Sequence, residues 1–198
     1  MSKALIISVL MLAGLPQART AEPVVAPDWT LEMADGSSVN LDDAASQRVT
    51  ILFFWATWCP YCKALMPHLQ SLKLEYPDTV QVLAINIFED GDPVAFIEDA
   101  GYEFTLLLSG DAVADRYGVT ATPGVFILDS NRTLHFDLRS LPRIVSSDHG
   151  DSASNQRKAA LRAPYWAAAI RKNVDELLQN TEAYHSSRAD AEQARKSL

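Results

Sequence analysis

The sequence predicts an α/β fold built on a mixed β-sheet, and two observations carry this prediction. Short runs of β-branched and aromatic residues, apolar on both faces, alternate with segments of helical periodicity, which is typical of buried parallel strands joined by helices. The last two such runs are separated by a turn alone, which predicts an antiparallel hairpin. The resulting order, β-α-β-α-β-β, indicates a sheet that is parallel in its first part and antiparallel at its end.

The chain enters this fold through an extended segment, residues 26–31, and a hairpin. Asp35 and Gly36 form a turn signal, and residues 38–41 alternate in polarity as a strand does. The next run, residues 49–55, is rich in β-branched and aromatic residues and apolar on both faces. It is predicted to be the buried central strand of the sheet.

A helix is predicted directly after the central strand. Leu65, Leu69 and Leu72 recur at i, i+4 and i+7, which places them on one face of a helix. Pro67 lies inside this pattern and is expected to kink the helix, because proline lacks an amide donor. Residues 80–87 then form a second buried strand.

The rest of the sheet follows in short elements. Asp92 and Pro93 are an N-cap and a first-turn proline, and the helix that they begin is closed by Gly101. A strand, a short helix and the two hairpin strands follow at residues 105–108, 111–117, 125–128 and 133–137.

The C-terminal part divides into three segments. Residues 139–163 show little apolar periodicity beyond a short helix expected around 155–161. They are interpreted as a surface insertion that either shapes partner choice or is flexible. A final helix is predicted over 165–178, with Trp166 in its apolar stripe as a core residue. The tail, residues 179–198, is polar and of mixed charge, so a frayed helix or disorder is expected.

The first 21 residues are typical of an export signal. Lys3 supplies a positive start, and residues 4–15 form an apolar run. This run is well short of the roughly 20 residues that a membrane-spanning helix needs, so a cleaved signal is favoured over an uncleaved membrane anchor. Export would place the folded domain, predicted over residues 26–178, in the periplasm.

Composition excludes some classes of protein. Hydrophobic residues make up 48% of the chain, which is enough for an ordinary core and excludes global disorder. The chain has 25 acidic and 17 basic residues, a formal net charge of -8. Nucleic acid is therefore not an expected partner, because binding phosphates requires a basic surface.

The two cysteines, Cys59 and Cys62, are separated by two residues. A bridge between them closes so short a loop that it restricts the unfolded chain only slightly, which disfavours a purely structural disulfide. A structural zinc site needs about four ligands, and the sequence has no second cysteine pair and no close histidine pair. Redox chemistry is therefore favoured, with neither a metal nor a cofactor expected.

The position of the pair assigns a role to each cysteine. The pair lies between a buried strand and a helix, and a helix N-terminus presents unpaired amides that favour a thiolate. Cys59 is predicted to have a lowered pKa and to be the attacking nucleophile. Cys62, one turn further into the helix, is predicted to resolve the mixed disulfide.

Two stretches, residues 55–62 (WATWCPYC) and 118–129 (GVTATPGVFILD), strongly resemble the thioredoxin superfamily and, within it, the exported TlpA/ResA-like branch. The entry segment, residues 26–31, is similar to that branch as well. The resemblance implies a thioredoxin-like fold, a central mixed sheet flanked by helices, here with the N-terminal hairpin as an extension. It also implies thiol–disulfide exchange with cysteine-containing exported proteins, and recharging by a membrane electron donor.

The resemblance further implies which residues support the cysteines. The bond between Thr122 and Pro123 is expected to be cis and to pack beside the pair, where the Thr122 backbone can bind a peptide. Trp58, Pro60 and Tyr61 flank the cysteines, and the last two are expected to tune the reduction potential.

Three residues depart from the family pattern. Tyr61 replaces the proline that commonly precedes the second cysteine. Leu65 stands where exported relatives often carry a glutamate, and Phe53 where thioredoxin has a buried aspartate. The proton acceptor for Cys62 is therefore left undecided: water, Glu89 or another group serves, or exchange is slower.

Several other functions remain as alternatives to a periplasmic reductant. A DsbA-like oxidant is disfavoured because the chain lacks room for that family's helical domain between residues 87 and 122. A cytochrome-maturation reductase is disfavoured because Gly124 replaces its usual glutamate. A thiol peroxidase carries Thr or Ser three residues before the reactive cysteine, where this chain has Ala56. A copper-binding module or metallochaperone would use the two cysteines with His135 or His149.

Overall fold

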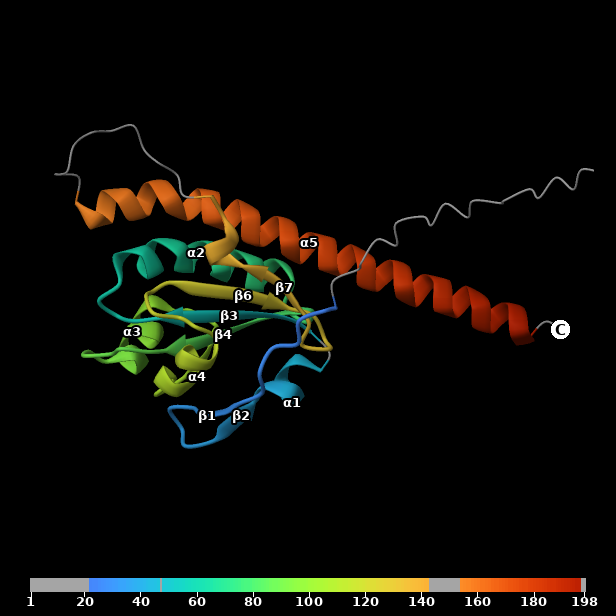
Figure 1. Cartoon of the computed structure of the whole chain (residues 1–198), viewed down its shortest axis with the longest axis horizontal. Helices are drawn as coiled ribbons and strands as arrows, with labels where there is room; N and C mark the ends of the chain where they lie inside the picture. Colours follow the sequence, from blue (N-terminus) through green and yellow to red (C-terminus); the bar gives the residue numbers. More distant parts are fainter. Residues whose placement is uncertain (1–21, 47, 143–153, 197–198) are drawn as a thin grey trace, which may run out of the picture.

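A five-stranded sheet with strand order β5-β4-β3-β6-β7 forms the centre of the computed structural model, which describes residues 22–46, 48–142 and 154–196 (Figure 1). The pairings β3–β4 and β4–β5 are parallel, whereas β6 is antiparallel to β3 and β7 to β6. The predicted mixed sheet is therefore confirmed. Its strands are β3 (Val49–Trp55), β4 (Val80–Asn86), β5 (Thr105–Leu107), β6 (Gly124–Leu128) and β7 (Leu134–Asp137).

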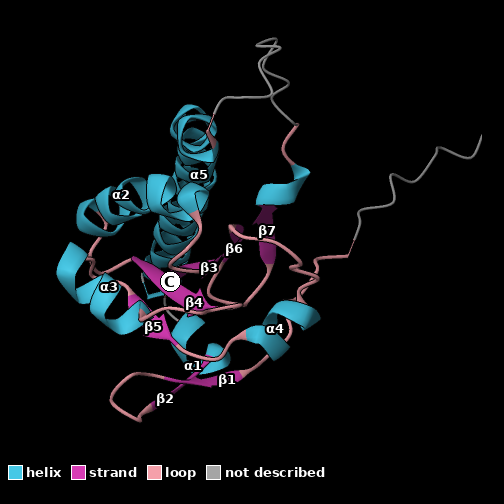
Figure 2. Ribbon diagram, turned by 90° about the vertical axis from the view of Figure 1, so that its left-hand side faces the viewer, coloured by secondary structure: helices cyan, strands magenta, loops and turns pink. Residues whose placement is uncertain are grey.

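The direction of the crossovers decides which face each helix covers. The helices α2 (Pro60–Glu75) and α3 (Pro93–Ala100) join β3 to β4 and β4 to β5, two steps in the same direction across the sheet. Because such crossovers are right-handed, both helices lie on one face. The long helix α5 (Asn155–Lys196) lies alongside α2 on this face (Figures 1 and 2).

The opposite face is covered by α1 (Leu41–Ala45), α4 (Asp111–Arg116) and the hairpin of β1 (Thr30–Glu32) and β2 (Ser38–Asn40) (Figure 2). Alternate side chains of β3 supply the two apolar cores. Phe53 and Trp55 pack with α2 and α5, whereas Leu52 and Phe54 pack with α1 and α4. All seven residues of β3 are buried, as expected of a central strand covered on both faces.

Local capping explains where the helices begin and end. The Asp92 side chain accepts a hydrogen bond from the Ala95 amide at the start of α3, and Gly101 ends that helix in the left-handed region with φ 68°. The helix α1 was not predicted. The Asn40 side chain caps it by accepting hydrogen bonds from the amides of Asp42 and Asp43.

The C-terminal segments agree with the prediction only in part. Residues 155–163, expected to belong to a surface insertion, are the first turns of α5, which continues through Pro164. Residues 138–140 form a 3-10 turn, and 143–153 lie outside the described residues. The tail from residue 179 is helical in its backbone as far as Lys196. The expected export signal, residues 1–21, also lies outside the described residues.

Among the described residues, no helix combines the length and the apolar character that crossing a membrane requires.

Candidate active site

The site is centred on a disulfide between Cys59 and Cys62 at the start of α2. Cys59 is the N-cap residue with extended backbone, and its Sγ accepts a hydrogen bond of 3.1 Å from the Cys62 amide. Pro60 occupies the first turn, where its fixed φ suits the helix and its missing amide costs nothing. The sequence places the pair here because a seven-residue buried strand ends at Trp55, four residues before Cys59.

This position stabilises the thiolate that forms when the disulfide is reduced. The unpaired amides of the first helical turn and the helix dipole both favour negative charge at the N-cap. The Cys62 amide already points at the Cys59 sulfur. Both cysteines are buried, with 1% of Cys59 and none of Cys62 exposed to solvent.

Trp58 is held on the surface next to the disulfide. Its indole Nε1 donates a hydrogen bond of 2.7 Å to the Phe88 carbonyl, while 49% of the side chain remains exposed. Phe88 is itself 41% exposed and has φ 52°, a conformation held by the Asp111 carboxylate, which accepts from the Phe88 amide at 2.9 Å. The Trp58 ring is therefore an exposed apolar surface beside the cysteines, held by its hydrogen bond to the Phe88 backbone.

Glu89 fixes the loop that precedes the cysteines. Its carboxylate accepts hydrogen bonds from the Thr57 amide at 2.9 Å and the Thr57 hydroxyl at 2.6 Å, and from the Asn86 side chain at 2.6 Å. Burial raises the pKa of Glu89, but these bonds and one from the Gly91 amide outweigh it and lower the pKa from 4.5 to about 2. A carboxylate this weakly basic and this fully engaged is a poor acceptor for the Cys62 proton.

We expect Glu89→Gln to destabilise the protein at neutral pH by about 1–2 kcal/mol. This figure is the free energy that corresponds to the lowered pKa of Glu89, discounted for solvent screening. Because the folded pKa is depressed, this stability is present above pH 4.5 and is lost as the pH falls towards about 2. Urea unfolding between pH 7 and pH 2 should therefore show a shallower acid loss in the variant. Glu98→Gln, at an exposed position of α3, is the matched control. Equal acid slopes for wild type and Glu89→Gln would contradict this assignment.

A groove of about 400 Å³ lies on the Tyr61 side of the cysteines. The Thr122–Pro123 bond is cis, as the resemblance implies, and both of its residues line the groove. The Thr122 hydroxyl is buried with no hydrogen-bond partner in the described part of the chain. Tyr61 contributes the other wall, so the groove joins three of the residues that the sequence places around the cysteines.

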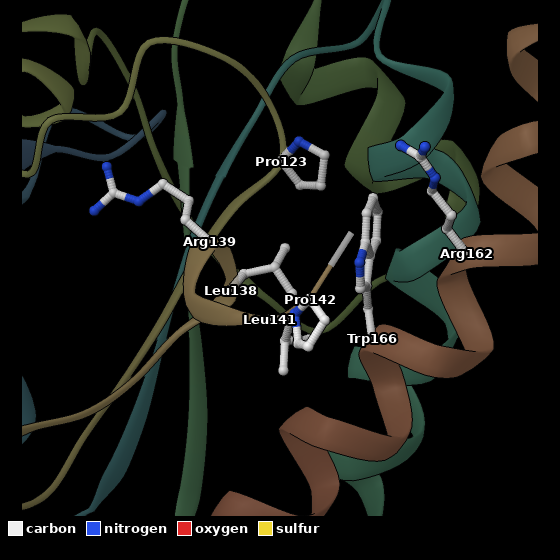
Figure 3. Close-up of a pocket in the computed structure, with 7 residues that line it drawn as sticks. All are labelled: Pro123, Leu138, Arg139, Leu141, Pro142, Arg162 and Trp166. Atoms are coloured by element: carbon white, nitrogen blue, oxygen red, sulfur yellow. The ribbon is translucent and has the colours of Figure 1, made fainter. Parts of the chain in front are cut away.

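Three further lining residues were not predicted as part of the site: Arg139, Arg162 and Trp166. Trp166 was expected in the core, but it is only partly buried and its ring centroid lies 5.9 Å from that of Tyr61. Figure 3 shows an adjoining groove of about 370 Å³, in which Trp166 faces Pro123, Leu138 and Leu141. The one available signal was the i, i+4 spacing of Arg162 and Trp166, which places both on one face of a helix.

The residues behind the alternative functions are placed elsewhere or lack the needed group. Ala56 is fully buried, and the neighbouring Thr57 hydroxyl donates to Glu89. His135 lies 3.0 Å from an Asp129 carboxylate oxygen, and His149 lies outside the described residues. Within the described ranges, no three His, Cys, Asp or Glu side chains gather as a metal site would require.

The mixed sheet, the Cys-x-x-Cys disulfide at the start of α2 and the cis-proline loop before β6 define a thioredoxin-like protein with a disulfide redox centre. Residues 24–136, more than half of the chain, match the model of the AhpC/TSA family. The chain therefore belongs to the AhpC/TSA family and is a ResA-like member of the thioredoxin superfamily.

Two curated relatives illustrate the likeness. The thioredoxin-like protein YneN of Bacillus subtilis is 33% identical over 108 residues, which cover 52% of this chain and 63% of that protein. The thiol-disulfide oxidoreductase ResA of Geobacillus thermodenitrificans is 35% identical over 109 residues, covering 54% of this chain and 62% of that one. The chain thus spans a little over six-tenths of the length of these relatives.

Solved structures share the fold. A putative thiol:disulfide interchange protein DsbE from Chlorobium tepidum is 30% identical with a TM-score of 0.53, covering 58% of this chain and 82% of that one. An uncharacterized conserved protein from Geobacillus kaustophilus is 24% identical with a TM-score of 0.60, covering 80% and 82%, and supports the fold alone.

Proposed function

We propose that this protein exchanges a disulfide between its Cys59–Cys62 pair and the cysteines of partner proteins, acting as a reductant. The observation that carries the proposal is the disulfide itself, capped at a helix N-terminus and bordered by a groove that includes the cis-proline loop. Similarity to proteins named thiol-disulfide oxidoreductase supports it.

In the proposed cycle the reduced pair gives two electrons to the partner. The Cys59 thiolate attacks one sulfur of the partner's disulfide, forming a mixed disulfide and releasing the first partner thiolate. Cys62 then loses its proton and attacks the Cys59 sulfur. This step closes the Cys59–Cys62 disulfide, and the second partner sulfur leaves as a thiolate that takes up a proton.

The surroundings of Cys62 bear on the second step. Phe53 and Leu65 are fully buried apolar residues in the same core cluster as Cys62. With Glu89 engaged by Thr57 and Asn86, we propose that water entering from the groove accepts the proton.

The architecture between the strands supports the reductant over a DsbA-like oxidant. Residues 87–122 are all described and contain only α3, β5 and α4, with no inserted helical domain. We expect the reduction potential of the pair to lie near that of thioredoxin, about -270 mV, when measured by equilibration with a glutathione or dithiothreitol buffer. A potential near that of DsbA, about -120 mV, would contradict the proposed direction.

We also propose that the protein works in the periplasm on cysteine-containing exported proteins, and that a membrane protein returns electrons to it. The charged start and short apolar run of residues 1–21 support export, with membrane attachment only if this signal stays uncleaved. The resemblance to the TlpA/ResA-like branch supports the partners.

A further inference from the structure

The grooves beside the disulfide are lined by basic and uncharged residues, although the protein as a whole is acidic. One groove is lined by Tyr61, Arg139 and Arg162, and a second of about 500 Å³, on the Trp58 side, includes Lys63. Among the described residues no Asp or Glu lines either groove or the one in Figure 3. The linings of these grooves therefore differ from the composition of the chain, which has 25 acidic residues against 17 basic ones.

The two arginines differ in how far their charge is already neutralised. The Arg139 guanidinium binds both carboxylate oxygens of Asp137, donates to the Gly118 carbonyl and stacks on Phe126. Arg162 forms no ion pair with any described carboxylate, and its guanidinium carbon lies 5.6 Å from the centroid of the Tyr61 ring. Figure 3 shows Arg139 pointing away from Trp166, while Arg162 rises from the same helix as Trp166. Of the two arginines, Arg162 is therefore the one whose charge no described carboxylate neutralises.

The position of Arg162 fits a ligand that is attached to an attacked cysteine. Tyr61 is two residues from Cys59, and an extended peptide advances about 3.3 Å per residue, so a side chain about two to four residues from the partner's cysteine would reach the guanidinium. The apolar rings of Trp166 and Tyr61 lower the local dielectric, which strengthens an ion pair formed there.

Resting on the proposed exchange function, we propose that Arg162 selects partner segments with an aspartate or glutamate about two to four residues from the cysteine that Cys59 attacks. Arg162 is a specificity residue in this proposal and takes no part in the electron transfer. Because Arg162 lies on the first turns of α5, these turns would take part in partner choice.

The test uses three peptides, each with a single cysteine, that differ only at the third residue from that cysteine, which is Glu, Gln or Lys. All their other residues are uncharged. The cysteine is joined by a disulfide to 2-nitro-5-thiobenzoate, whose thiolate is coloured when released. Cys59 attacks the peptide sulfur and releases the thiobenzoate, and Cys62 then displaces the peptide as a free thiol. Closure of one Cys59–Cys62 disulfide therefore supplies the two electrons that reduce one peptide and one thiobenzoate. The rate of thiobenzoate release is measured in single turnovers with excess reduced protein at low ionic strength. We expect the Glu peptide to react fastest and the Lys peptide slowest, with a Glu-to-Lys rate ratio of about five to ten that falls with added salt.

Variants separate Arg162 from the general charge of the protein. Arg162→Gln should bring the Glu-to-Lys ratio close to one, and Arg162→Glu should invert it. Lys172→Glu makes the same change of net charge at an exposed position of α5, where Lys172 pairs with Glu176, and should leave the ratio unchanged. Because the ratio is taken within each variant, a uniform change in Cys59 reactivity cancels.

Equal rates for the three peptides with wild-type protein would overturn the role of Arg162, as would a ratio that neither Arg162 variant moves. Failure of every peptide to release the coloured thiolate would instead overturn the proposed exchange function.

Discussion

Replacing Cys59 by serine is expected to lower the rate of disulfide exchange by at least about a thousandfold, because the attacking thiolate is replaced by a hydroxyl that stays protonated. The N-cap position of Cys59 and the Cys62 amide 3.1 Å from its sulfur are the features that favour the thiolate. The measurement is the rate at which the reduced protein cleaves a disulfide in a folded or peptide substrate.

Cys62→Ala separates the two steps of the exchange. The first attack should still occur, but no thiol remains to resolve the mixed disulfide, so the covalent complex should accumulate. Non-reducing electrophoresis detects it, and the variant that also carries Cys59→Ser should form none. Exchange at the wild-type rate by Cys59→Ser would refute the assigned roles.

Gly124→Glu is expected to reduce the free energy of unfolding by about 3 kcal/mol or more. Gly124 is the first residue of β6, a strand buried throughout. A Cβ added there would lie 3.0 Å and 3.2 Å from the two Val119 methyl carbons and 3.3 Å from Phe54 Cβ. The glutamate side chain would have to be accommodated among these apolar groups, where desolvation of its carboxylate is costly.

The matched variant is Gly124→Ala, which adds only the crowded methyl group and should cost about 1–2 kcal/mol. Urea unfolding of both variants at pH 7 gives the two values. If Gly124→Glu proves as stable as the wild type, the strand has room for the glutamate that cytochrome-maturation reductases carry. The expected clash of a side chain at residue 124 with Val119 and Phe54 would then be wrong.

The sheet could be predicted from sequence because its signals are local. Residues 49–55 form an unbroken run rich in β-branched and aromatic residues, and the structure gives β3 these same bounds. The Asp92 cap and the Gly101 stop likewise defined α3. The helix α1 was missed because Leu41 continues the alternation of a strand, whereas the Asn40 side chain in fact binds two amides and starts a helix.

The length of α5 was also missed, for a physical reason. The polar composition of the first turns of α5 and of the tail gave little amphipathic signal, and the predicted helix began only after Pro164. Proline lacks one amide donor, but the rest of the ladder holds, and Ile170 and Val174 bury that helix against the sheet.

The candidate site was predictable only in part. The Cys-x-x-Cys pair and the Thr122–Pro123 loop are motifs readable over a few residues. Arg162 and Trp166 approach Tyr61 because α5 packs against α2, a contact between segments about a hundred residues apart in sequence that no local pattern encodes. An apolar stripe shows that Trp166 faces the protein, but the fold determines that its neighbour is Tyr61, the residue before Cys62.

The central claim is that Cys59 is the sulfur that bonds to partner proteins, and mapping the complex trapped by Cys62→Ala tests it most directly. The complex is isolated under non-reducing conditions, digested, and analysed by mass spectrometry for the cross-linked peptide. A disulfide between Cys59 and a cysteine of the partner is the predicted result. A trapped partner bound by noncovalent contacts alone, with Cys59 recovered as a free thiol, would contradict it.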